Sequence, residues 1–163
     1  MIVGKLYADG VNQHTLGAPD LPHVELRIEE ALFERGEDEA DHEAHADALV
    51  DVLRETYFAL NSRPAVVYAM PHLLRSAIAD YQDEPPVTED SLQEDELEYP
   101  VWLTVFTPAL VETYGRETLL SSPAWRTYEW DDGSIVLVAY PDPELPQIMD
   151  EFEEHLGFEP TGL

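Results

Sequence analysis

The segment that decides the fold is WRTYEWDDGSIVLVAY, residues 125–140. Two runs rich in aromatic and β-branched residues flank DDGS. Asp, Gly and Ser favour a turn, and the runs on either side of DDGS have the composition of strands. The segment therefore predicts a β-hairpin with a short, polar connection.

Further strands are expected on the N-terminal side of this hairpin. Residues 64–70 (PAVVYAM) and 99–107 (YPVWLTVFT) are apolar at positions that would lie on both faces, as in interior strands. Residues 2–7 (IVGKLY) also have the composition of a strand. HVELRIE, residues 23–29, alternates apolar with charged residues, which is the period-two pattern of a half-buried strand.

Helices are expected between these strands and at the end of the chain. The clearest pattern covers residues 40–60, whose apolar side chains recur at helical spacing and form one stripe. Pro64 lies where this helix should have ended. Pro71, Pro108 and Pro143 lie where three other helices should begin, because proline is compatible with the first helical turn.

The order of these elements predicts an α+β fold. We expect a mixed, mostly antiparallel sheet of about six strands, covered by about four helices in a two- or three-layer sandwich. The length of 163 residues favours a single globular domain over residues 1–163. An acidic stretch at about residues 83–98, which contains no basic residue, is expected to be a solvated, mobile loop.

Charge is the most unusual property of the composition. Asp and Glu number 35 against 8 Lys and Arg, and the formal net charge is -27. A compact chain with this charge repels itself in dilute buffer, whereas at molar salt the Debye length falls to about 3 Å. Because 44% of the residues are hydrophobic, the chain can still form a core. We therefore expect a halophilic, haloarchaeal-like protein with an acidic surface.

Several classes of function are excluded or disfavoured by the composition. The chain has no cysteine, which excludes disulfides, thiolate zinc sites and cysteine nucleophiles. No apolar run approaches the ~18 residues of a membrane span, and the first residues lack a signal-peptide pattern, so we expect a cytoplasmic protein without a membrane partner. Direct nucleic-acid binding is not expected, because a basic stripe is missing.

A metal site is the first candidate for chemistry. Asp38, His42 and His45 would lie on one stripe at the start of the helix expected over 40–60. A divalent metal such as zinc accepts imidazole nitrogen and carboxylate oxygen, and it would need one or two more ligands from elsewhere. HEAH is one residue shorter than the HExxH motif of zinc hydrolases. The alternative is that both histidines are solvated or half-buried beside neighbouring carboxylates.

The few arginines are the second candidate. If Arg27, Arg63 and Arg126 converge in pairs, they could bind a carboxylate or phosphate ligand through two hydrogen bonds each. The alternative is that each forms an ordinary surface salt bridge with one of the many acids, which is a weak interaction.

No motif assigns an activity, so whether the protein is an enzyme stays open. The chain contains no P-loop, no G-x-G-x-x-G and no G-x-S-x-G. The sequence favours a non-enzymatic accessory protein, monomeric or homodimeric, that binds a protein or small molecule without a cofactor. One alternative is a small metal-dependent hydrolase that uses His42 and His45. The other is an acidic nucleic-acid mimic, whose carboxylates imitate phosphates.

Overall fold

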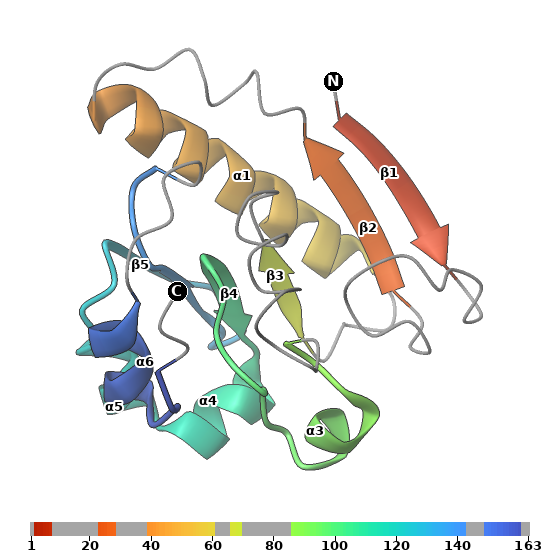
Figure 1. The fold of residues 1–163 in the computed structure, drawn as a ribbon. Coiled ribbons are helices and arrows are strands. Elements are labelled where there is room, and N and C mark those ends of the chain that lie inside the picture. Colours follow the sequence, from red (N-terminus) through yellow and green to blue (C-terminus); the bar gives the residue numbers. More distant parts are fainter. Residues whose placement is uncertain are drawn as a thin grey trace.

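A computed structural model (Figure 1) describes most of the chain, and its ranges are residues 2–7, 23–28, 39–60, 66–69, 86–142 and 149–160. For residues 2–7, 23–28 and 39–42 only the backbone is described. The fold within these ranges is α+β, as predicted from the order of apolar patterns.

A four-stranded antiparallel sheet forms the centre of the fold. In spatial order its strands are β3 (Val67–Ala69), β4 (Leu103–Phe106), β6 (Ile135–Val138) and β5 (Arg126–Glu129). The predicted hairpin is confirmed, because β5 pairs with β6 and places Glu129 opposite Ile135. Every residue of β4 and β6 is buried, as expected for interior strands with a covered surface on each face.

The remaining two described strands form a sheet of their own. Strands β1 (Ile2–Tyr7) and β2 (His23–Ile28) pair antiparallel, with Ile2 opposite Ile28. The prediction of one mixed sheet of about six strands is therefore wrong for the described residues: the strands are divided between two sheets, and every pairing is antiparallel. The reason is that an alternating pattern specifies which face of a strand is buried, but not which strand lies beside it.

Five helices are described where about four were predicted: α1 (Glu39–Ala59), α3 (Glu89–Gln93), α4 (Pro108–Tyr114), α5 (Arg116–Leu120) and α6 (Asp150–Leu156). Helix α1 confirms the prediction over residues 40–60. The helix expected after Pro71 lies outside the described residues. Among the helices that the structure describes, none combines the length and the apolar character needed to cross a membrane.

One extra helix arises because the segment after β4 is divided by a glycine. Gly115 has a φ of 84°, which ends α4 before α5 begins at the next residue. Its N–H donates to the carbonyl of Val111, and its own carbonyl accepts from the N–H of Leu119. This backbone conformation is rarely adopted by residues with a Cβ, so glycine is required at the break.

The other extra helix, α3, lies in the acidic stretch that was expected to be a loop. Ser91 N–H donates to Thr88 Oγ1 over 3.1 Å, and Thr88 N–H donates to Ser91 Oγ over 2.9 Å, which together form a capping box. Val87 and Leu97, on either side of the helix, are buried in the core. The expectation of a loop is thus wrong for Glu89–Gln93, while the mobility of the stretch stays a prediction.

The sheet and helices form three layers (Figure 1). Alternate residues of β4 and β6 point to opposite faces. One face packs against α1 and contributes Leu103, Val105, Val136 and Val138 to a cluster with Leu49, Val50, Leu53 and Tyr57. The other face packs against α4, α5 and α6 and contributes Phe106, Ile135 and Leu137 to a second cluster with Leu110, Leu119, Phe152 and Leu156. The prediction allowed two or three layers, and the described residues form three.

Candidate functional site

A line of polar contacts joins α1 to the edge strand β5 and to the turn that follows it. We call this line the α1–β5 seam, and its pairs are Glu43–Arg126, Asp47–Tyr128, Arg54–Asp131 and Tyr57–Asp132. Glu43, Asp47 and Arg54 share one flank of α1, beside the apolar stripe that packs on the sheet, and Tyr57 belongs to that stripe. The seam therefore attaches α1 along the edge of the sheet.

The seam stays in register because the two elements advance by similar distances. From Glu43 to Asp47 the helix rises about 6 Å at 1.5 Å per residue. From Arg126 to Tyr128 the strand rises about 7 Å at 3.3 Å per residue. One helical turn therefore matches two strand residues, and those two side chains share one face of the strand.

Arg126, one of the three predicted ligand-binding arginines, belongs to the seam. Its guanidinium forms an ion pair with Glu43 and lies 5.1 Å from the ring centroid of Trp125. Both members of the ion pair are partly exposed, so the pair contributes at most about 1 kcal/mol to stability. Arg27 is described only as backbone in β2, and Arg63 lies outside the described residues. Binding of a ligand by these arginines stays a prediction.

Tyr128 contributes a short hydrogen bond to the seam. Its hydroxyl donates to Asp47 Oδ1 over 2.6 Å. Burial raises the pKa of Tyr128 above its ordinary value, and the hydrogen bond to Asp47 and the charge of Asp47 raise it further. The hydroxyl therefore stays protonated and acts as a donor that holds α1, which does not suit the role of a base.

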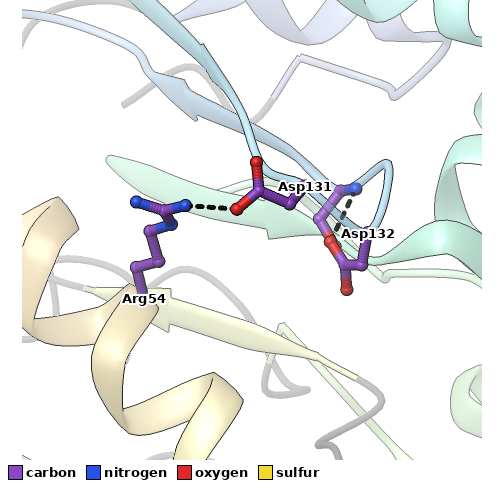
Figure 2. A network of polar contacts seen from close by, with 4 residues as sticks. Arg54, Asp131 and Asp132 are labelled. Carbon is purple, nitrogen blue, oxygen red and sulfur yellow. Dashed lines mark hydrogen bonds and ion pairs between the residues drawn. The ribbon is translucent and has the colours of Figure 1, made fainter.

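The turn between β5 and β6 is attached to α1 by two adjacent carboxylates. Figure 2 shows Arg54 extending from α1 to Asp131, with a distance of 2.6 Å between Nη2 and Oδ2. The hydroxyl of Tyr57 donates to Asp132 Oδ2 over 2.9 Å, and Asp132 Oδ1 accepts the N–H of Ser134 over 3.1 Å. Sequence reasoning recognised these acids as turn formers and missed their attachment to α1.

An exposed aromatic ring lies beside this turn. Phe58 is 37% exposed, and its ring centroid lies 5.1 Å from that of Tyr57 and 5.9 Å from that of Trp130. Tyr57 and Trp130 are buried, and their ring centroids lie 5.3 Å apart. The guanidinium of Arg54 is 6.0 Å from the Phe58 ring centroid. We call Arg54, Phe58 and Asp131 the Phe58 patch.

The Phe58 patch was not found from the sequence, although a signal for it exists. Phe58 follows Tyr57, which belongs to the buried stripe of α1, and residues that follow one another on a helix point about 100° apart. Phe58 must therefore lie off the stripe, four residues after Arg54 and within its reach.

The predicted metal ligands are only partly described. Asp38 lies outside the described residues, His42 is described as backbone in α1, and His45 is half-buried on the same helix. Among side chains that the structure does describe, no group of three His, Asp or Glu residues is placed to hold a metal ion. A metal site built on Asp38, His42 and His45 stays a prediction.

A serine and a histidine also approach each other, at the C-terminal end of α5. Ser121 Oγ lies 3.4 Å from His155 Nε2, and the same nitrogen lies 3.0 Å from the carbonyl oxygen of Thr118. Because a carbonyl only accepts hydrogen bonds, Nε2 carries the proton and cannot take one from Ser121. Ser121 Oγ also donates to Thr118, over 3.2 Å. Both side chains therefore cap α5, and this is not the arrangement of a nucleophile with its base.

Comparison of the chain with models of protein families, with curated proteins and with solved structures found no match. We therefore interpret the surface from its own contacts. The α1–β5 seam consists of contacts within the chain. The Phe58 patch, in contrast, presents part of an aromatic ring and a guanidinium to the outside.

Proposed function

We propose that the protein is a salt-adapted, non-enzymatic accessory protein of the cytoplasm that binds another protein through the Phe58 patch. The observation that supports this proposal is the environment of Phe58. Its ring is 37% exposed, yet it rests against the buried aromatic rings of Tyr57 and Trp130.

The chemistry of the patch is that of an interface anchor. Aromatic residues and arginine supply a large share of the binding energy in protein interfaces. A ring already held by its neighbours loses little side-chain entropy when a partner covers it. Arg54 adds a planar donor beside the ring, and it is positioned by Asp131.

Salt adaptation makes an aromatic contact more important. At molar salt the Debye length is about 3 Å, so attraction between separated charges is largely screened. Burial of an apolar ring does not depend on such attraction. Phe58 is thus suited to binding at the molar salt concentrations that are expected to stabilise the acidic protein.

The acidic composition also supports adaptation to a salt-rich environment. Asp51 and Glu55 are exposed on α1, and Glu89 and Asp90 are exposed on α3. Repulsion between such carboxylates weakens the compact state unless salt screens it. We therefore expect the protein to work in a cytoplasm rich in KCl.

The test is a comparison of Phe58→Ala with Leu120→Ala in a co-purification from a cell extract at molar KCl. Leu120, on α5, is the other large apolar side chain that is exposed in the described part of the chain, at 40%. We expect wild type and Leu120→Ala to retain the same partner in stoichiometric amount, and Phe58→Ala to lose it. Equal retention by all three proteins would contradict the proposal.

The same preparations test the alternatives. Near-stoichiometric zinc in protein purified without a chelating tag, absent from a His42→Ala/His45→Ala variant, would favour the metal-dependent hydrolase. The nucleic-acid mimic would be favoured if a DNA-binding protein were retained equally by wild type and Phe58→Ala. Competing DNA should then release that protein.

A further inference from the structure

The turn between β5 and β6 contains the sequence Asp132–Gly133, in which backbone isomerisation is chemically possible. The backbone nitrogen of Gly133 attacks Cγ of Asp132, a C–N bond forms, and one carboxyl oxygen leaves as water with the amide proton and the carboxyl proton. The product is a five-membered succinimide. Addition of water to either of its carbonyl groups gives aspartate or isoaspartate, so no oxidant or reductant is needed.

The structure holds each reacting group of this turn in a hydrogen bond. The N–H of Gly133 donates to the carbonyl oxygen of Trp130 over 3.0 Å. Asp132 Oδ1 accepts the N–H of Ser134 over 3.1 Å, and Oδ2 accepts the hydroxyl of Tyr57 over 2.9 Å. Succinimide formation removes the proton of the Gly133 nitrogen and one oxygen of the Asp132 carboxyl group, so the hydrogen bonds of that N–H and of that oxygen are lost.

These hydrogen bonds also lower the reactivity of the two groups. An ionised carboxylate is a poorer electrophile than a carboxylic acid, and donated hydrogen bonds favour the ionised form. Tyr57 is only 2% exposed, so its hydroxyl approaches Asp132 from a side chain that is packed in the core. The Tyr57 contact therefore attaches the reactive residue itself to α1, next to the ion pair of Arg54 with Asp131.

We propose that Asp132 is a site of isoaspartate formation and that the hydrogen bond from the Tyr57 hydroxyl suppresses this reaction in the folded protein. Isomerisation inserts the Asp132 Cβ into the backbone and leaves the α-carboxylate as the side group. The carboxylate can then no longer meet Tyr57 and Ser134 together. Loss of the Tyr57 contact removes one of the attachments of the turn to α1, beside the pair Arg54–Asp131 and the ring of Phe58.

The experiment compares ageing of the folded wild type, Tyr57→Phe and Tyr128→Phe at neutral pH in molar KCl. Tyr128→Phe is the matched control, because it removes one hydroxyl from the same seam at a contact with Asp47. After trypsin digestion, Asp132 is in peptide 127–163, and the other Asp–Gly pair, Asp9–Gly10, is in peptide 6–27. Isoaspartate in each peptide is quantified by chromatography with electron-transfer fragmentation.

We expect Tyr57→Phe to accelerate isomerisation at Asp132 severalfold, and Tyr128→Phe to leave it at the wild-type rate. The extent of isomerisation at Asp9–Gly10 is the internal reference, because all three proteins contain this pair unchanged. In urea all three proteins should isomerise at Asp132 equally, because the protection belongs to the folded state.

Three results would overturn the proposal, two of them from the variants. One is an equal rate at Asp132 in folded Tyr57→Phe and folded wild type. The other is an equal acceleration by Tyr128→Phe, which would assign the effect to general loosening of the seam. The wild type alone provides a test that needs no variant: isomerisation at Asp132 that is as fast in the folded protein as in urea would show that no protection exists.

Discussion

The hydroxyl of Tyr128 on the edge strand β5 donates a 2.6 Å hydrogen bond to Asp47 Oδ1 on α1, 81 residues away in the chain. It joins the longest described helix to the edge of the sheet, and it does so with a donor that remains protonated. Its partner is a carboxylate, and hydrogen bonds to charged groups stabilise proteins more than neutral ones do.

Removal of this hydroxyl tests the contribution of the seam. Tyr128→Phe is expected to lower the free energy of unfolding by about 1 kcal/mol, because the bond to a carboxylate is lost at a partly exposed site. Urea denaturation in molar KCl measures the change. Thr127→Val, at an exposed neighbouring position of β5, is the control and should change stability by less than about 0.5 kcal/mol. Equal effects of the two variants would mean that the hydrogen bond contributes nothing.

Two adjacent leucines of α5 test the position of the core. Leu119 is 0% exposed and packs in the cluster on the α4–α6 side of the sheet, while Leu120 is 40% exposed. Leu119→Ala should cost about 2–5 kcal/mol through lost burial and a cavity. Leu120→Ala should stay within about 0.5 kcal/mol. Thermal and urea unfolding of both variants check the difference, and similar losses would contradict the orientation of α5.

Alkaline pH should destabilise the protein through Tyr140. Burial first, and then the charge of Asp142, raise the pKa of Tyr140 to about 12. Between the ordinary tyrosine pKa of about 10 and this value the unfolded state loses a proton that the folded state keeps, so stability falls as pH rises. The stabilisation is fully present below about pH 10. Tyrosinate absorbance and urea midpoints across this range measure the effect.

A Tyr140→Phe variant isolates that contribution. The hydroxyl of Tyr140 is buried and has no hydrogen-bond partner among the residues that the structure describes. Its removal should therefore leave stability at neutral pH unchanged or raise it by about 1 kcal/mol, since an unsatisfied buried polar group is costly. The fall in stability above pH 10 should become shallower. An unchanged alkaline profile would assign the pH dependence to other groups.

Salt should stabilise the fold strongly. We expect the melting temperature to rise between about 0.1 M and 3 M KCl, because screening removes repulsion among the carboxylates. Asp51→Asn/Glu55→Gln, at exposed positions of α1, should raise the melting temperature at low salt and reduce the difference. Scanning calorimetry at both concentrations measures it. Equal melting temperatures in the wild type would disprove the halophilic interpretation.

The amino-acid sequence by itself determined the local elements and the character of the surface. The hairpin β5–β6, the buried strand β4 and the long helix α1 follow from apolar patterns and turn residues within a single short segment. The acidic surface follows from composition. Each of these properties depends on neighbours in the chain, which is why periodicity is sufficient to predict them.

Tertiary structure alone decided how these elements are attached and what they expose. The division of the described strands into two sheets, the α1–β5 seam and the setting of Phe58 all depend on residues distant in sequence. Periodicity shows which face of α1 is buried, but the partners along its flank depend on the match between helix rise and strand rise. That match exists only once both elements have packed on the same core, so it cannot be derived from either segment alone.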